Sequence, residues 1–338
     1  MFSQLLAIFR NTFVESIRQP IAIVVIIACN LVLALCVAGA GYTMDDDNLL
    51  FIPLGLSTLL LGGLFLAGFT ATGVVSLEIE NKTALTVVSK PVTRPLFILG
   101  KYLGVAGALL MAMWPMICTL LLCVRHGVMQ TASTSYDGPV ILFGLLAFFG
   151  ALFVGLMVNY LYRWPFVSTF IWMFNATMTL ALILVLVVDK EWHLQSITTE
   201  FTNHESPIAR FAVAILLLIE TLLIFCAIAV ALSTRLGQVM TILIMIGVSV
   251  VISALGPFYA NAARDAGSGD LLIEGKRVVA SVMYHVMPVL DFLWVADDLS
   301  AGIAVSGTYV LTVSLYSGLL IVALLGIAVA LFQTREVG

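Results

Sequence analysis

The sequence predicts an all-α fold, a polytopic membrane helix bundle of about eight transmembrane helices. Hydrophobic residues make up 62% of the 338 residues and charged residues only 10%, whereas soluble domains are about 45–50% apolar and about 25% charged. Apolar runs of about 20 residues, long enough to cross a bilayer, recur along the chain. They must be helical, because lipid gives the backbone no hydrogen-bond partners. We expect one membrane domain over residues 1–338.

The first element, residues 1–19, is expected to be an amphipathic helix in the inner membrane interface. Pro20 separates it from the first span, because proline disfavours helix in the residue before it. A simple cytoplasmic leader is the alternative interpretation. The apolar positions recur at helical spacing and are Phe2, Leu5, Leu6, Phe9, Phe13 and Ile17.

Eight apolar runs follow as expected spans: 21–40, 49–76, 97–124, 139–161, 165–188, 207–233, 237–256 and 307–332. A cytoplasmic N-terminus puts nine of the fifteen Lys and Arg residues on the inner side, in keeping with the excess of cations in cytoplasmic loops. Both termini are therefore expected in the cytoplasm, with the chain in a plasma membrane of the bacterial inner-membrane type. The outer connection 257–306 is expected to form re-entrant or interfacial short helices, because a ninth span would put Asp291 near mid-membrane.

Charge concentrates in one segment between the second and third spans. Residues 77–104, "LEIENKTALTVVSKPVTRPLFILGKYLG", hold six of the charges. Glu78 and Lys82 lie four apart with the acid first, an order that stabilises a helix surface. Pro91 and Pro95 prevent that helix from continuing into the third span. The segment therefore predicts a short helix followed by a rigid, kinked connection.

The same segment resembles permease subunits of type-2 ABC transporters. The matching positions are Glu80, Lys82, Thr83, Ser89, Lys90, Pro91, Val92, Arg94, Gly100, Lys101 and Gly104. The end of the chain is similar to the family's final third, with "YHVMPVLDFLWVADDLSAG", an apolar span and "FQTRE" in that order. The departure lies in the middle, where the family's common core has fewer spans and the hairpin 139–188 is an extra element.

The resemblance implies the permease subunit of an ATP-driven exporter. It implies that residues 76–95 form a coupling segment that rests on a separate ATPase subunit, and that the permease pairs with a second copy or a paralogue. The implied coupling residues are Glu78, Glu80, Lys82, Thr83, Lys90, Pro91 and Arg94. The alternative for the basic residues is that they only satisfy the positive-inside tendency.

Nothing in the sequence predicts catalysis in this chain. A phosphate-binding loop needs Gly-x-x-x-x-Gly-Lys followed by Ser or Thr, and Gly100-Lys101 and Gly275-Lys276 lack that context. ATP is therefore expected on the partner subunit, and we expect neither a cofactor nor a nucleic-acid partner here. Zinc signatures are absent from the sequence. The soft side chains of the third span are more typical of packing than of a copper(I) path; they are Met111, Met113, Met116, Cys118, Cys123 and His126.

Glu220 falls deep inside a predicted span. An acid at that depth typically faces the bundle interior or a wet cavity, so Glu220 is a candidate to contact substrate or carry a proton. The structural alternative is a hydrogen bond, or a protonated acid paired with a polar residue such as Asn175 or Asn159, the other candidate intramembrane polar groups. An ion-coupled secondary transporter using Glu220 is the rival function, and a membrane scaffold without cargo is a third.

Two further patterns concern packing. Gly100, Gly104 and Ala108 lie one turn apart, and small residues at this spacing let membrane helices approach closely. We expect them to pack within the chain rather than to form a dimer seam. All five cysteines fall within predicted spans, so no structural disulfide is expected.

Overall fold

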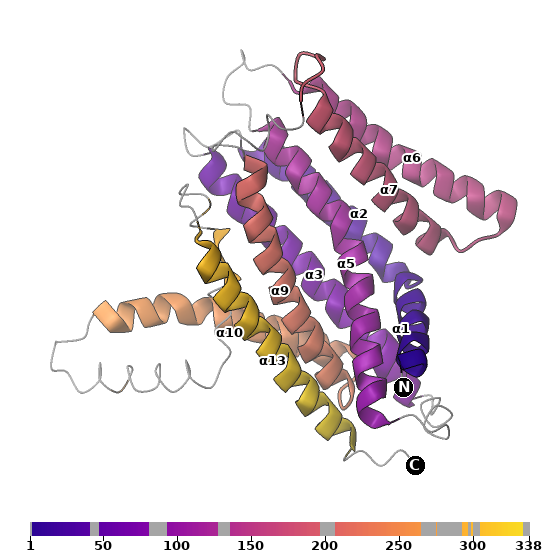
Figure 1. The fold of residues 1–338 in the computed structure, drawn as a ribbon, viewed down its shortest axis with the longest axis vertical. Coiled ribbons are helices and arrows are strands. Elements are labelled where there is room, and N and C mark those ends of the chain that lie inside the picture. Colours follow the sequence, from indigo (N-terminus) through magenta and orange to yellow (C-terminus); the bar gives the residue numbers. More distant parts are fainter. Residues whose placement is uncertain are drawn as a thin grey trace.

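The structure, a computed structural model, is all-helical in the long elements that it describes (Figure 1). It describes residues 2–40, 47–80, 93–127, 136–196, 207–264, 275, 293–296, 299 and 305–333. The helices are α1 (Phe2–Ile17), α2 (Pro20–Ala40), α3 (Asp47–Glu80), α5 (Arg94–His126), α6 (Gly138–Tyr162), α7 (Phe166–Val187), α9 (Pro207–Ser233), α10 (Gln238–Arg264) and α13 (Gly307–Gln333).

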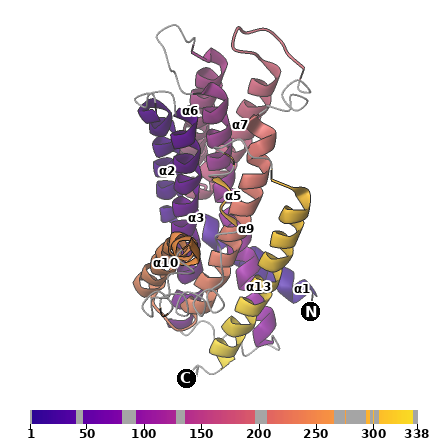
Figure 2. The same ribbon diagram turned by 90° about the vertical axis from the view of Figure 1, so that its left-hand side faces the viewer.

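The predicted membrane bundle is confirmed. Within the described ranges, seven helices are long and apolar enough to cross a membrane, and they coincide with seven of the predicted spans. The remaining predicted span, 237–256, lies in α10, whose described apolar part is the shorter stretch Gln238–Val251. Both views show α10 running across the direction of the long helices (Figures 1 and 2). Most of the predicted outer segment 257–306 lies outside the described residues.

Three helices form the centre of the bundle. More than half of the residues in the spans of α3, α5 and α9 are buried, against fewer than a quarter in α2, α6 and α13. Leu66, Leu109 and Phe225, one from each central helix, are almost wholly buried. The outer helices instead expose many leucine and valine side chains, which is the arrangement that a lipid environment favours.

Helix α1 packs along the first half of α5, and small residues allow the close approach. A Cβ atom at Gly100 would lie 2.7 Å from Ile8 Cγ2, and one at Gly104 would lie 2.5 Å from Thr12 Cβ. Side chains larger than hydrogen would therefore push the two helices apart. The expectation that this glycine stripe packs within the chain is confirmed. The placement of α1 in the membrane interface stays a prediction.

The hairpin of α6 and α7 stands to one side of the bundle (Figure 1). Aromatic rings hold its two helices together, since Phe148 lies edge-on to Phe174 with ring centroids 5.7 Å apart. The hairpin attaches to α5 mainly through α7, and one of these contacts is the 2.8 Å hydrogen bond that Trp114 Nε1 donates to Thr179 Oγ1. This hairpin corresponds to the predicted hairpin 139–188, which the family resemblance implies to be an extra element.

The helices from α2 to α9 alternate in direction along the bundle, whereas α13 runs parallel to α9, and these directions define two ends of the bundle (Figure 1). The start of α5, the α9–α10 turn and the end of α13 meet at one end, which we call the Arg94 end. The N-terminus lies at this end as well (Figure 1). The end of α5, the start of α6 and the end of α7 meet at the opposite end, the Arg125 end.

Candidate functional site

Arginine side chains gather around the last turn of α13 at the Arg94 end. Arg94 Nη1 donates a 2.7 Å hydrogen bond to the carbonyl of Gln333, and Arg235 Nε donates a 3.1 Å bond to the carbonyl of Leu331. The guanidinium of Arg94 also lies 6.0 Å from the centre of the Phe332 ring. The last carbonyls of a helix lack partners within the helix and carry partial negative charge, so cations stabilise them.

Two further contacts tie α3 into the same end. Lys101 is 2% exposed, and its ammonium donates to the carbonyl of Val74 at 3.4 Å. It also lies 5.5 Å from the centre of the Phe97 ring. Ser76 Oγ donates a 3.3 Å bond to the carbonyl of Leu236 in the α9–α10 turn. Residues that are far apart in the sequence therefore join α3, α5, α9 and α13 into one cluster.

This cluster borders the predicted coupling segment on both sides. Glu78 and Glu80 belong to the last turn of α3, but their side chains lie outside the described part. Arg94 is the first residue of α5, and Pro95 follows at a position where helices accept proline. The predicted positions that lie wholly outside the described residues are Lys82, Thr83, Lys90 and Pro91.

Glu220 contacts α13 rather than a polar residue of the hairpin. Ser314 Oγ donates a 2.6 Å hydrogen bond to Glu220 Oε1. The second carboxyl oxygen, Oε2, is buried and has no hydrogen-bond partner in the described structure. A buried polar atom left without a partner is costly to maintain. Glu220 therefore lies between α9 and α13 with one carboxyl oxygen hydrogen-bonded and the other without a partner in the described structure.

Asn175 and Asn159 do not pair with Glu220. Asn175 Nδ2 donates to the carbonyl of Ile171 in its own helix at 2.8 Å. Asn159 Nδ2 donates to the carbonyl of Trp164 at 2.6 Å and so closes the turn between α6 and α7. The structure therefore corrects the suggested partnership: both asparagines satisfy backbone carbonyls of the hairpin, and a serine is the partner of the acid.

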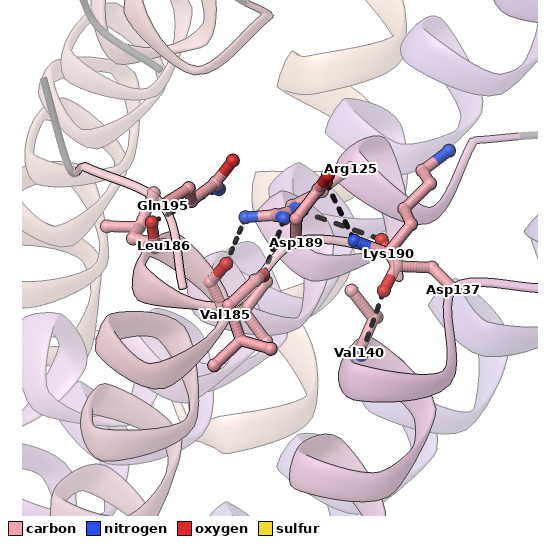
Figure 3. Close-up of polar contacts among 9 residues, drawn as sticks. Arg125, Asp137, Val140, Val185, Leu186, Asp189, Lys190 and Gln195 are labelled. Carbon is pink, nitrogen blue, oxygen red and sulfur yellow. Dashed lines mark hydrogen bonds and ion pairs between the residues drawn. The ribbon is translucent and has the colours of Figure 1, made fainter. Parts of the chain in front are cut away.

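The sequence interpretation missed a second polar cluster, at the Arg125 end. Figure 3 shows Arg125, in the last turn of α5, reaching toward the end of α7 and the start of α6. Its guanidinium donates to the carbonyls of Val185 and Val188, the latter at 2.9 Å. Arg125 Nε also lies 3.7 Å from Asp137 Oδ2. This arginine thereby attaches both helices of the hairpin to α5.

Asp137 serves the start of α6 as well. Its Oδ1 accepts a 3.2 Å hydrogen bond from the amide of Val140, which is the N-cap arrangement that aspartate favours. The signal for the cap is readable in the sequence, because Asp137 precedes Gly138 and Pro139 at the start of an apolar run. The pairing with Arg125 has no such signal, since it depends on how the helices pack.

Within the described ranges, no group of three or more His, Cys, Asp and Glu side chains is arranged to hold a metal ion. Comparisons with known proteins add no identity: no family model, no curated protein and no solved structure matches the chain. The two polar clusters and the acid at the α9–α13 seam are therefore the features on which a functional interpretation rests.

Proposed function

We propose that this chain is the membrane-spanning permease subunit of an ATP-driven ABC exporter of the type-2 class. It would work with separate ATPase subunits and with a second permease copy or a paralogue, in a plasma membrane of the bacterial inner-membrane type. The observation that carries the proposal is the match of residues 78–104 to the coupling region of such permeases. The bundle of long apolar helices supports it.

The contacts at the Arg94 end support a mechanical role for the segment between α3 and α5. Arg94 holds the last turn of α13, and Lys101 joins α5 to α3. Ser76 joins α3 to the turn that follows α9. A displacement of the segment would therefore act on four packed helices together, because each link is a direct hydrogen bond. Packed interfaces switch between discrete arrangements rather than deform continuously.

Energy must come from another subunit, because the chain lacks the glycine-rich loop that binds ATP phosphates. Closure of the ATPase subunits around ATP would push on residues 76–95, and the push would tilt the helices that flank them. Charges at the rim of this contact would orient the partner more than they would strengthen binding. Outward movement of the substrate follows from the family resemblance.

Site-specific crosslinking tests this proposal. A photoreactive residue at position 82 or 90 should capture an ATP-hydrolysing subunit when the chain is expressed in the cells of its own source organism. The matched control is position 190, an exposed lysine at the Arg125 end, which should capture no ATPase. A cysteine at position 90 should also resist a membrane-impermeant maleimide added to intact cells. Capture of no nucleotide-hydrolysing protein, or labelling from outside, would refute the proposal.

An ion-coupled secondary transporter is the second candidate, and one observation favours it. Glu220 keeps a buried carboxyl oxygen without a hydrogen-bond partner in the described structure, and intramembrane acids often mark ion pathways. In that case, Glu220→Gln should abolish transport while the protein stays folded, and transport should follow the proton gradient without an ATPase. Full transport by Glu220→Gln would end this candidate.

A further inference from the structure

The turn between α6 and α7 is exposed along its whole length. Residues 159–165 all expose their side chains, and Figure 1 shows this end of the hairpin projecting away from the other helices. Tyr160 is 80% exposed, Tyr162 68% and Trp164 61%. The rings of Tyr162 and Trp164 lie on either side of Arg163 along the chain, with centroids 6.4 Å apart.

Arg163 occupies a backbone conformation in which glycine or asparagine is usual. It caps the end of α6 with φ 56° and ψ 28°, the left-handed region, which few residues with a branched or long side chain adopt. The turn is nevertheless well held, because the Arg163 amide donates to Asn159 O at 3.0 Å and Asn159 Nδ2 donates to Trp164 O at 2.6 Å. An unfavourable conformation retained with a large cationic side chain points to a role for that side chain.

The hairpin's length places this turn at a membrane surface. Helix α6 has 25 residues and so extends about 37 Å at 1.5 Å per residue, whereas the hydrocarbon core of a bilayer is about 30 Å thick. Exposed aromatic side chains occur at the opposite end of the hairpin too, at Tyr136 and Trp192. Tyrosine and tryptophan favour the level of the lipid headgroups, so both ends of the hairpin lie at headgroup depth.

The two ends differ in charge. The loop at the Arg125 end mixes Asp189, Lys190 and Glu191. The turn at the other end contains Arg163 and no acid, and in the described structure no hydrogen bond or ion pair involves the Arg163 side chain. A cation at headgroup depth, between two amphipathic rings and without a protein anion, is complementary to a phosphate-bearing lipid of net negative charge.

We propose that the α6–α7 turn, residues 160–164, is a binding site for the headgroup of an anionic phospholipid. The guanidinium of Arg163 would bind the phosphate and offset the net negative charge of the lipid. The rings of Tyr162 and Trp164 would lie along the glycerol region. The site would hold the end of the hairpin at one membrane surface. It requires only that the hairpin spans a bilayer, and it is independent of any ATPase partner.

The backbone conformation of Arg163 supplies a variant that should fold. Arg163→Gly removes the cation and relieves the left-handed strain, so the turn should be at least as stable as in the parent protein. Arg163→Lys keeps the charge in the same backbone. A thermal unfolding measurement on both variants establishes that the fold is retained before lipid binding is compared.

Trp164 can report the lipids that lie beside the turn. In a protein whose other tryptophans are replaced by phenylalanine, Trp164 fluorescence is quenched by lipids brominated on acyl carbons near the headgroup. Vesicles of equal phosphatidylcholine and phosphatidylglycerol are prepared twice, with one lipid or the other brominated. The matched control is a protein that retains only Trp172, an exposed residue in the first third of α7, about two turns along the helix from Trp164, measured in the same vesicles.

One basic residue near a membrane surface favours anionic lipid by about fivefold. We therefore expect brominated phosphatidylglycerol to be preferred about fivefold at Trp164, and the preference to persist in Arg163→Lys and disappear in Arg163→Gly. The lipid preference at Trp172 should be the same in all three proteins. An unchanged preference in Arg163→Gly would overturn the proposal. So would a Trp164 that neither lipid quenches, because a protein partner would then cover the turn.

Discussion

Replacing Asp137 by asparagine should destabilise the protein by about 3 kcal/mol, because Arg125 would keep its charge without its carboxylate partner. Both side chains are nearly inaccessible, at 8% for Arg125 and 0% for Asp137. Removing one member of a buried ion pair costs about 3–5 kcal/mol. The lower value applies here, because the 3.7 Å between Nε and Oδ2 exceeds a hydrogen bond and two carbonyls still hold the guanidinium.

Two companion variants separate the roles of Asp137. Asparagine can still accept the bond from the Val140 amide, whereas alanine cannot, so Asp137→Ala should lose about 1 kcal/mol more. Arg125→Met combined with Asp137→Asn leaves no buried charge. Its total loss should therefore be smaller than the sum of the losses in the two single variants.

The assay is the free energy of unfolding, measured by titrating sodium dodecyl sulfate into dodecyl maltoside micelles. The series compares the parent, the single variants Asp137→Asn, Asp137→Ala and Arg125→Met, and the double variant under one set of conditions. The reasoning fails if the unfolding free energy of Asp137→Asn stays within about 1 kcal/mol of the parent's, because ordinary surface substitutions have effects no larger than that. Strict additivity in the double variant would also refute it, because the two residues would then not interact.

Three other substitutions test the remaining contacts, and Gly150→Ala is the control for the first of them. Gly104→Ala should cost about 1–3 kcal/mol through overpacking against α1, whereas Gly150→Ala should cost nothing, because nothing lies within 4 Å of its Cβ position and alanine is favoured over glycine inside a helix; chemical denaturation compares them. Arg94→Gln should destabilise the last turn of α13 by about 1 kcal/mol, which would be measured as roughly fivefold faster amide exchange there. Glu220→Gln retains an acceptor for Ser314, so its unfolding free energy should change by less than about 1 kcal/mol.

Specific outcomes would contradict these expectations. Equal losses at the two glycines would mean that α1 does not pack on the stripe. Arg163→Gln is the control for the exchange experiment, because Arg163 lies in a different turn. If amide exchange in α13 became faster in Arg163→Gln, or did not become faster in Arg94→Gln, the proposed link between α5 and α13 would be refuted. Unfolding of Glu220→Gln would show that the carboxyl does more than accept the bond from Ser314.

The polar sites were only partly readable from the sequence. The resemblance of residues 77–104 to type-2 permeases makes Arg94 a candidate, but its contact with Gln333 joins residues more than two hundred positions apart, which no local pattern encodes. The depth of Glu220 in an apolar run makes it a candidate, yet the predicted asparagine partners are wrong, because helix packing places Ser314 beside the carboxyl group. The sequence shows that a buried polar side chain needs a hydrogen-bond partner, whereas the packing of the helices determines which residue that partner is.

Composition and the length of the apolar runs predict a helical membrane bundle, because they leave the backbone no other way to satisfy its hydrogen bonds in lipid. Proline, charge and polar turns interrupt those runs, so the ends of the seven long apolar helices are predicted to within about four residues, whereas α10 continues eight residues beyond its predicted end. Three features could be seen only once the helices were packed: which helices are central, the contact of α1 with Gly100 and Gly104 of α5, and the attachment of the hairpin by Arg125. These outcomes depend on the shapes of facing surfaces, and in lipid close packing rather than hydrophobicity selects the neighbours.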